Sequence, residues 1–437
     1  MIDVLSAHRL VQRWLQVEVE LARAQAGIGI IPSSAAQAIA DAAQGLDFDS
    51  DALWESSRTV GYPIFPLVRM LDAALPEEFR GLVHLGVTTQ DIMDTGLVLQ
   101  LRDALGVILG HVEAAGDGLA LLVDRHATTV MAGRTHAHQA VPITLGMKLA
   151  VFLGEFARHR ARIINLATDI SVLSLHGAAG TSSAFGDSAA EVRSRVADSL
   201  GLRPVEIPWH VSRDRLTSLM TTLTAAATTC TRLAREVISL SRTEIGELGE
   251  NTGHHRGASS TMPQKRNPII SEAIIGFGVY ATALASAVFR AAEHEHERAA
   301  GEWQIEWAVV PNLLHSCSSA MRLACRLVDD LEVYPDRMLE NLAGDRGSIM
   351  SEAHMMRLAP ILGRERAHDA VYAAVELARQ QEIDLPAAVE EVLGEIGGDE
   401  IEADVIAPDQ YVGEAERVCK AAIESWTSNR TSQGAPK

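Results

Sequence analysis

The sequence predicts an all-α protein built around long helices. Apolar residues make up 47% of the chain but aromatic residues only 4%, so the interior must be built mainly from Ala, Leu, Val and Ile. That composition suits the packing of helix against helix. Strand patterns are scarce, because no run of alternating Val, Ile, Thr and Tyr is closed by Asn-Gly or Asp-Gly. A small hairpin around residues 207–211 is the one exception we allow.

Two segments carry the periodicity of long amphipathic helices. In residues 145–170 and again in residues 216–240, apolar positions recur at alternating steps of four and three, and the second segment holds neither Gly nor Pro. Spacing of this kind over several heptads implies long, nearly parallel helices in a bundle. Apolar runs at 274–289 and 309–331 predict two further helices of the same bundle.

A chain of 437 residues is long enough for two or three domains. We expect an N-terminal helical domain at residues 1–97 and a C-terminal helical domain at residues 350–437. Between them, residues 98–349 are expected to form the central long-helix domain.

Charge and cysteine usage restrict the partners. The 38 basic and 57 acidic residues give a formal net charge of -19, which repels polyanions, so we expect no nucleic acid partner. The four cysteines form no CxxC pair, and nowhere do 18 apolar residues run together. We therefore expect a cytoplasmic protein with reduced thiols, no membrane partner, no metal and no cofactor.

One basic segment stands out in this acidic chain, the loop GASSTMPQKRNP at residues 257–268. Turn-forming Gly and Pro residues prevent it from being helical throughout, and the hydroxyls of Ser259 and Ser260 lie near Lys265 in sequence. The stretch just before it adds His254 and Arg256. Such a loop can enclose a carboxylate, although an ordinary surface linker with incidental cations has the same composition.

A second stretch, His84 to Asp94, places Thr88 and Thr89 just before a helix start at Asp91. Capping explains Asp91, and the two threonines could also bind an anion at the helix N-terminus.

A third stretch, GRTHAHQAVP at residues 133–142, places His136 between Gly133 and Pro142 near the start of a long helix. A histidine there is available as an acid or a base, while a purely structural role is equally compatible with the residues.

Taken together, the three stretches resemble the fumarase/aspartase superfamily, in the branch of adenylosuccinate lyases and 3-carboxy-cis,cis-muconate cycloisomerases. The match spans most of the chain, and the loop at 257–268 is the signature of the family. The resemblance implies a three-domain fold whose central long-helix bundle is shared in a homotetramer. It also implies active sites assembled from three subunits and a small polycarboxylate as substrate.

The resemblance also implies roles for individual residues. Ser259 matches the base that removes a proton next to a carboxylate, and Lys265 matches a residue that holds this carboxylate as it gains charge. His136 matches the general acid of adenylosuccinate lyase. The remaining residues implied in substrate binding are Thr88, Thr89, Ser260, Asn267, His84, Arg298 and Met262. We expect Lys265 and the loop amides to stabilise the deprotonated form of Ser259.

Departures from the two named enzymes bear on the substrate. Residues 296–307 contain Gly301, Trp303 and Trp307, as in the cycloisomerases, where adenylosuccinate lyases have a Ser/His-rich run that helps to hold a nucleotide phosphate. His136, in contrast, matches the lyases. We expect a smaller polycarboxylate rather than a nucleotide.

Three functions follow as hypotheses. The first is a carbon-nitrogen or carbon-oxygen lyase that releases fumarate or a close relative from a substituted succinate by anti elimination. The second is a lactonising 3-carboxy-cis,cis-muconate cycloisomerase. The third is a catalytically silent structural homologue, since fold alone does not establish function.

Overall fold

The computed structural model describes residues 1–46, 50–250, 257–262, 264–396 and 406–431. The chain forms two compact units. Unit 1 comprises Met1–His111, Arg160–Thr228 and Phe277–Ala320, and unit 2 comprises Val112–His159, Thr229–Gly276 and Met321–Lys437. Both units contain parts of the expected central domain, and the expected boundaries at residues 97 and 350 stay a prediction.

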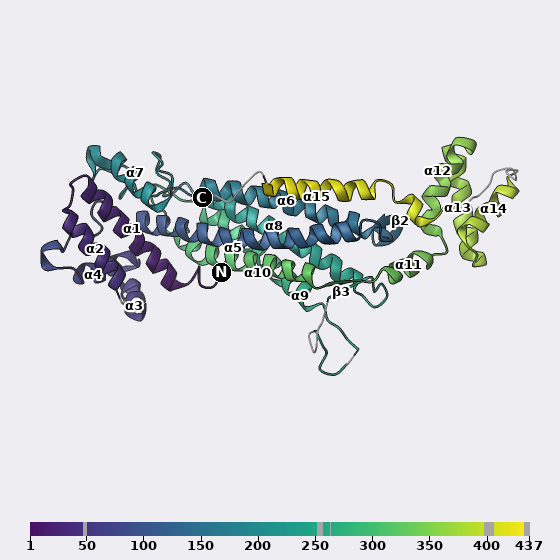
Figure 1. The fold of residues 1–437 in the computed structure, drawn as a ribbon, viewed down its shortest axis with the longest axis horizontal. Coiled ribbons are helices and arrows are strands. Elements are labelled where there is room, and N and C mark those ends of the chain that lie inside the picture. The colour runs from purple at the N-terminus through teal and green to yellow at the C-terminus, as the bar shows by residue number, and fades with distance from the viewer. Residues whose placement is uncertain (47–49, 251–256, 263, 397–405, 432–437) are drawn as a thin grey trace. The chain divides into compact units, whose positions relative to one another are not determined.

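Five long helices confirm the all-α expectation (Figure 1). They are α5 (Thr89–Arg125), α6 (Leu145–Ile170), α8 (Asp214–Leu240), α9 (Ile269–Ala291) and α10 (Glu302–Asp329). The periodicity located α6 and α8 to within two residues, and the apolar runs at 274–289 and 309–331 located α9 and α10 less closely, since these helices begin five and seven residues earlier. Only the start of α5 was expected, because its apolar residues are spread around the helix instead of forming one stripe.

The start of unit 1 is a cluster of shorter helices, drawn in purple in Figure 1 together with the teal α7. They are α1 (Ala7–Gly27), α2 (Ser33–Gly45), α3 (Ser50–Val60), α4 (Ile64–Ala73) and α7 (Ala189–Leu200), and α1 packs against both α2 and α7. Helix α1 is capped by Ser6, whose hydroxyl accepts the backbone N–H of Arg9 at 3.2 Å. Its buried side chains, among them Trp14 and Leu21, enter the core of unit 1.

The strands of the described residues are short and lie in unit 2. Strand β1 (Val130–Thr135) pairs antiparallel with β2 (His138–Thr144), and β3 (Leu248–Glu250) pairs antiparallel with β4 (Leu331–Val333). The hairpin allowed for residues 207–211 was wrong, because that segment carries no strand. The hairpin at 130–144 was not predicted, since its turn holds no Asn-Gly or Asp-Gly pair.

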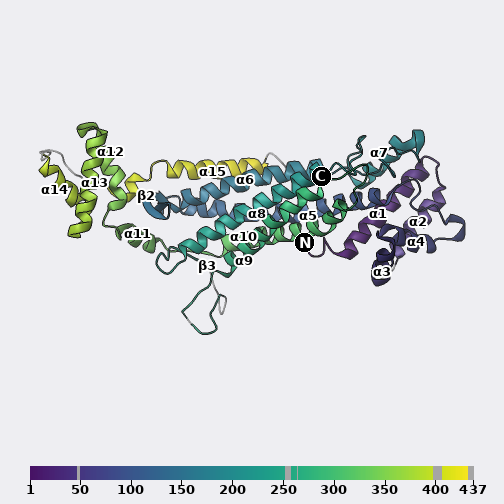
Figure 2. The ribbon, with the colours of Figure 1, turned by 180° about the vertical axis from the view of Figure 1, so that it is seen from behind.

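The C-terminal part of unit 2 contains a three-helix cluster, visible from both sides in Figures 1 and 2. It consists of α12 (Ser351–Leu362), α13 (Arg364–Gln381) and α14 (Leu385–Glu395), and these helices share one apolar core. Helix α11 (Pro335–Ala343) contacts strand β1. The 3-10 helices of both units are η1 (Glu77–Phe79), η2 (Gly186–Ser188), η3 (Ser348–Met350) and η4 (Pro408–Tyr411).

The last helix, α15 (Ala415–Thr431), returns to the long helices of unit 2. Trp426 on α15 donates its indole N–H to Asp117 of α5 at 2.9 Å. Gly116 leaves the space for the indole, because a Cβ at this position would lie 2.2 Å from the Trp426 ring. This glycine is therefore required for close packing.

Two helices, α5 and α9, are long and apolar enough to cross a membrane by length and composition alone. The core helices of soluble proteins pass the same test, so the observation is weak evidence for a membrane span. Cys230, Cys317, Cys325 and Cys419 are free cysteines in the structure.

Candidate active site

The loop at 257–268 lies in unit 2 and closes on itself through its two ends. The backbone N–H and the side-chain amide of Asn267 both donate to the carbonyl oxygen of Gly257, at 2.9 and 3.1 Å. Ala258 forms an antiparallel bridge with Arg266. Gly257 has a φ of 67°, and a Cβ there would lie 2.6 Å from the Asn267 carbonyl oxygen. Glycine is therefore the residue that permits this closure.

Inside the closed loop, the Ser259 hydroxyl is surrounded by donors. Its Oγ accepts the backbone N–H of Thr261 at 3.3 Å and that of Met262 at 3.1 Å. Ser259 is half-buried, whereas Ser260 and the Met262 side chain are exposed. Two N–H groups directed at one oxygen stabilise a negative charge on it. Met262 thus contributes its backbone N–H to this arrangement.

The cation of the loop is Lys265. Its backbone N–H donates to the Met262 carbonyl at 3.1 Å, and its side chain is exposed. No carboxylate of the described residues forms an ion pair with Lys265, so its ammonium group remains available to an anion. His254, Arg256 and Pro263, which the sequence analysis included in this stretch, lie outside the described residues.

The end of the loop is anchored to helix α9 by Glu250 of strand β3. The buried carboxylate accepts the backbone N–H groups of Ile270 and Ser271 at 3.0 and 2.8 Å, and thereby caps the helix. A cavity of about 160 Å³ adjoins this anchor. Its lining includes Glu250, Arg266, Asn267, Pro268 and Tyr334. Glu250 could not be singled out from the sequence, because its partners lie twenty residues further along the chain.

His136 occupies the tip of the β1–β2 hairpin in unit 2. Thr135 pairs with His138, so His136 and Ala137 form a two-residue turn in which their φ angles are 48° and 68°. A turn of this kind favours Asn-Gly, and left-handed φ costs other residues about 1–2 kcal/mol each. The imidazole is exposed at this tip. Backbone strain of this kind concentrates at functional sites.

A buried ion pair holds the hairpin. Arg134 of β1 donates to both oxygens of Glu247, at 2.8 and 2.6 Å, and the Glu247 carboxylate is fully buried. Asn341 adds a further hydrogen bond to the same carboxylate at 2.8 Å. No sequence pattern indicates a role for Arg134, Glu247 or Asn341.

In unit 1, helix α5 starts at Thr89, two residues before the start predicted at Asp91, which lies in its first turn. The Asp91 carboxylate accepts the backbone N–H of Thr88 at 3.1 Å. It also accepts the backbone N–H groups of His176 and Gly177 and the Nε2–H of His210, all within 2.9 Å. Because Asp91 is fully buried, these four donors fix the segment that carries the threonines.

His84 precedes this helix and contacts a carboxylate. Its Nδ1 lies 2.6 Å from Oε1 of the buried Glu18 of α1. Burial alone would lower the pKa of His84, but the hydrogen bond and charge of Glu18 and the charge of Asp91 outweigh it, so this pKa is raised. His84 is therefore favoured as an imidazolium.

Arg298 lies in the segment that leads into α10. Its Nε donates to Gln90 of α5 at 2.9 Å. Its Nη2 is buried and has no hydrogen-bond partner among the described residues. In unit 1 the structure thus connects Arg298 to the first turn of α5.

Also in unit 1, Arg213 is fully buried between two carboxylates. It binds Asp94 through both Nη atoms at 2.9 and 3.0 Å and Glu306 through Nε and Nη2 at 2.7 and 2.5 Å. Burial lowers the pKa of Arg213, but the two carboxylates raise it more, so the guanidinium stays charged.

The tryptophans that the sequence analysis singled out pack together in unit 1. Trp303 is buried, stacks on Tyr62 at 5.8 Å between ring centroids and meets Trp307 edge-on at 5.1 Å. Both tryptophans line a cavity of about 560 Å³, which Trp14 and Trp54 also line.

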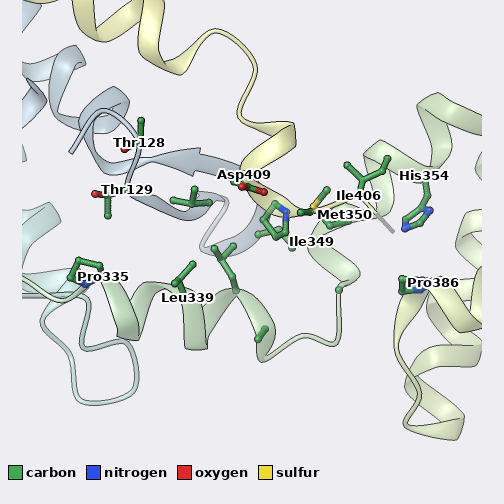
Figure 3. A pocket seen from close by; sticks show the side chains of 16 residues that line it. Thr128, Thr129, Pro335, Leu339, Ile349, Met350, His354, Pro386, Ile406 and Asp409 are labelled. Atoms are coloured by element: carbon green, nitrogen blue, oxygen red, sulfur yellow. The ribbon is translucent and has the colours of Figure 1, made fainter. Parts of the chain in front are cut away.

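Another cavity, of about 660 Å³, lies in unit 2. Figure 3 shows Thr128, Thr129, Leu339, Ile349 and His354 around it. None of the predicted site residues lines this cavity, and its walls are mainly apolar. Among the described residues, no group of three or more His, Cys, Asp or Glu side chains could hold a metal ion.

The chain matches a family model described as Lyase over residues 1–281. The chain is 40% identical to a 3-carboxy-cis,cis-muconate cycloisomerase of Pseudomonas aeruginosa, over 96% of this chain and 93% of that one. It is 35% identical to trans-aconitate decarboxylase 1 of Mycosarcoma maydis, over 95% and 85%. It is 33% identical to an N-acetyl-S-(2-succino)cysteine lyase of Enterococcus italicus, over 85% and 82%.

Two solved structures share the fold over almost the whole chain. One is the 3-carboxy-cis,cis-muconate lactonizing enzyme of Pseudomonas putida, with a TM-score of 0.89 and 36% identity over 98% of this chain and 96% of that one. The other is a fumarate lyase of a Mesorhizobium species, with a TM-score of 0.88 and 35% identity over 97% and 96%. The chain is therefore an enzyme of the lyase family, within the fumarase/aspartase superfamily that its three sequence stretches resemble.

Proposed function

We propose that this enzyme eliminates a leaving group from a substituted succinate and releases fumarate or a close relative. Ser259 acts as the base and His136 as the acid. The observation that carries the proposal is the Ser259 oxygen, which accepts two backbone N–H groups in the closed loop. These donors stabilise the alkoxide that is needed to remove a weakly acidic carbon-bound proton.

In the proposed reaction, Ser259 Oγ takes a proton from the carbon next to one carboxylate of the substrate. The electron pair of that C–H bond enters the carboxylate, which Lys265 and Asn267 hold as its charge increases. The pair then forms the C=C bond while the bond to the leaving group breaks. His136 gives a proton to the leaving group, a contribution on the order of 10² to 10⁴ in rate.

Residues of unit 1 bind the acid groups of the substrate in this proposal. Thr88 and Thr89 offer hydroxyls at the N-terminus of α5, where the helix dipole favours an anion. Arg298 supports them with a guanidinium nitrogen that has no hydrogen-bond partner among the described residues. His84 adds a further positive charge, and Ser260 and Met262 complete the proposed set.

The substrate class that fits these groups is a tricarboxylate. The three relatives described above are named after a carboxymuconate, an aconitate and a succinocysteine. Each of these molecules carries three carboxyl groups. A succinate linked through nitrogen, oxygen or sulfur to a group with its own carboxylate is therefore the first substrate to test.

A lactonising cycloisomerase is the second candidate, favoured by the identity to the Pseudomonas aeruginosa enzyme. In that reaction a carboxylate oxygen of a muconate adds to the molecule's own double bond, and no leaving group departs. His136 separates the two functions. Turnover of carboxymuconate that survives His136→Ala would favour the cycloisomerase, whereas elimination requires this acid.

A mass-spectrometric screen tests the proposal. Purified protein is incubated with succinates that carry an N-, O- or S-linked acid on carbon 2 and with carboxymuconate, and fumarate or lactone is measured. We expect fumarate from at least one substituted succinate, and loss of this product in Ser259→Ala. Ser199→Ala, at an exposed position of α7, is the matched control. Lactone formation without any elimination would overturn the leading proposal.

We also propose the homotetramer that the sequence resemblance implies. Helix α9 is apolar around its circumference, yet its exposed side chains include Phe277, Val279, Tyr280 and Phe289. A helix that is apolar on an exposed face needs a further partner surface. In the proposed tetramer, other copies of this chain supply that surface. We propose active sites shared by three subunits as part of the same assembly.

A further inference from the structure

The buried carboxylate of Glu18 is the feature that the proposed chemistry leaves unexplained. Its side chain is 1% exposed, and Oε1 contacts Nδ1 of His84 at 2.6 Å. Oε2 is buried and has no hydrogen-bond partner among the described residues. A buried carboxylate with one partner is costly unless that partner carries the opposite charge. Glu18 therefore depends on His84 being an imidazolium.

Helix α1 holds the segment around His84 at two points. Glu18 binds the imidazole, and Gln25, two turns further along α1, donates its side-chain amide to the carbonyl of Leu85 at 2.7 Å. His84 itself has a φ of 59°, a left-handed conformation that is uncommon for residues other than glycine. The ring is therefore fixed by α1 in both position and direction.

The second nitrogen of the ring is available. Nδ1 is occupied by Glu18, whereas Nε2 has no hydrogen-bond partner among the described residues and is not enclosed by protein. The side chain is 20% exposed. An imidazolium donates from both nitrogens, so Nε2–H can bind an acceptor from outside the protein.

The charged groups that face His84 come from two helices. Glu18 lies on α1 and Asp91 on α5, and both are negative. Asp91 is already bound to His210 and to three backbone N–H groups, so its charge is shared among several donors. Glu18 has only His84, which makes Glu18 the group that sets the charge of this imidazole.

We propose that Glu18 is a positioning residue that keeps His84 as an imidazolium, whose Nε2–H binds one carboxylate of the substrate. The proposal rests on the proposed function and assigns one of the three carboxylates to this position. His84 lies five residues before Thr89. The substrate carboxylate that His84 binds and the one bound at the start of α5 therefore belong to the same end of the substrate. A substrate with an uncharged amide or ester there loses the charge-assisted hydrogen bond.

The variant that isolates the charge is Glu18→Gln in the full-length protein. Glutamine keeps an oxygen that accepts the Nδ1–H bond, so the ring direction is retained while the charge is removed. Glu20→Gln is the matched control, because Glu20 lies on the same helix and pairs with the exposed Arg23. Melting temperatures establish that both variants fold.

The first measurement is the affinity for succinate and for propane-1,2,3-tricarboxylate, by calorimetry across the neutral pH range. We expect the native protein and Glu20→Gln to bind the tricarboxylate more tightly than succinate. Their advantage falls as pH rises through the raised pKa of His84. In Glu18→Gln the same advantage falls at a lower pH. At a pH above the His84 pKa of both proteins, the advantage is smaller in the variant by about tenfold for each unit by which this pKa drops. Identical pH profiles in Glu18→Gln and the native protein would overturn the proposal.

The second measurement follows the His84 ring directly by NMR titration in the native protein and in Glu18→Gln. A lower titration midpoint in the variant supports the proposal, and an unchanged midpoint contradicts it. His84→Asn is the additional variant, because Asn tolerates left-handed φ and is never charged. It should bind the tricarboxylate with an affinity independent of pH over this range.

With a turned-over substrate in hand, Glu18→Gln should raise KM and leave kcat nearly unchanged. If elimination is normal but the affinities do not respond to Glu18, this inference fails and the proposed function stands. If no substituted succinate is turned over while the tricarboxylate binds with the expected pH profile, the proposed function fails and the charge-setting role of Glu18 stands.

Discussion

The guanidinium of Arg134 is bound by both oxygens of the Glu247 carboxylate, which is fully buried. The pair lies two residues before His136, so it holds the strand that presents the proposed acid. Bidentate pairs of this kind fix geometry as well as charge.

Glu247→Ala should destabilise the protein by about 3–5 kcal/mol, because it leaves a largely buried guanidinium without its counter-charge. Denaturant unfolding measures this difference. Glu191→Ala breaks an exposed pair with Arg195 and should cost about 1 kcal/mol or less. Equal effects of the two variants would show that the buried pair contributes no more than a surface pair.

Gly257→Ala should abolish most activity and leave the unfolding free energy nearly unchanged. The added Cβ would meet the Asn267 carbonyl oxygen at 2.6 Å, so the loop cannot close around Ser259. Gly106→Ala on α5 is the control, because a Cβ there meets no atom within 4 Å. Alanine in a helix is expected to add up to about 1 kcal/mol of stability. Normal kcat in Gly257→Ala would contradict the role of this closure.

The stabilising effect of the Glu18–His84 pair should depend on pH. The pKa of His84 is raised in the folded protein, so its contribution is fully present below the ordinary histidine value and is lost as pH rises through the folded value. Glu18→Gln should therefore destabilise the protein more at about pH 6 than at about pH 9. Denaturant unfolding at the two pH values measures this difference, and an equal loss at both would contradict the prediction.

Arg213→Met should destabilise the protein by about 3–5 kcal/mol, because it leaves two buried carboxylates facing each other without a cation. Combining it with Asp94→Leu and Glu306→Leu should recover much of the loss, since no buried carboxylate then lacks a cation. Thermal unfolding of the single and triple variants makes the comparison. Asp94 also accepts the side-chain amide of Gln90 at 3.1 Å, so the triple variant should stay less stable than the native protein. A triple variant less stable than Arg213→Met would contradict the prediction.

Phe289→Glu on α9 should dissociate the proposed tetramer. The side chain is 56% exposed in the single chain, and a carboxylate there is incompatible with an apolar interface between copies. Light scattering after gel filtration measures the mass in solution. Arg290→Glu, at the next position of the same helix, tests whether any acidic substitution has this effect. A native protein that is monomeric would contradict the proposal without any variant.

Much of the fold could be predicted from local patterns. Residues 145–170 were predicted as a helix and form α6 with the same bounds, since an apolar repeat is visible within a single segment. The β1–β2 hairpin was missed because His136 and Ala137 adopt left-handed φ without being Gly or Asn. Such strain is imposed by the surrounding protein and leaves no mark in the composition of the turn.

The candidate site divides in the same way. Local sequence patterns were enough to single out the loop at 257–268, the segment 84–94 with a helix start placed at Asp91, and His136, because each belongs to a run of neighbouring residues. Only the tertiary structure decided that Glu18 lies against His84 and Glu247 against Arg134, across 66 and 113 positions of the chain. Glutamates occur throughout an acidic sequence of this kind. What distinguishes these two is burial, which removes water from the carboxylate and makes its charge depend on one partner.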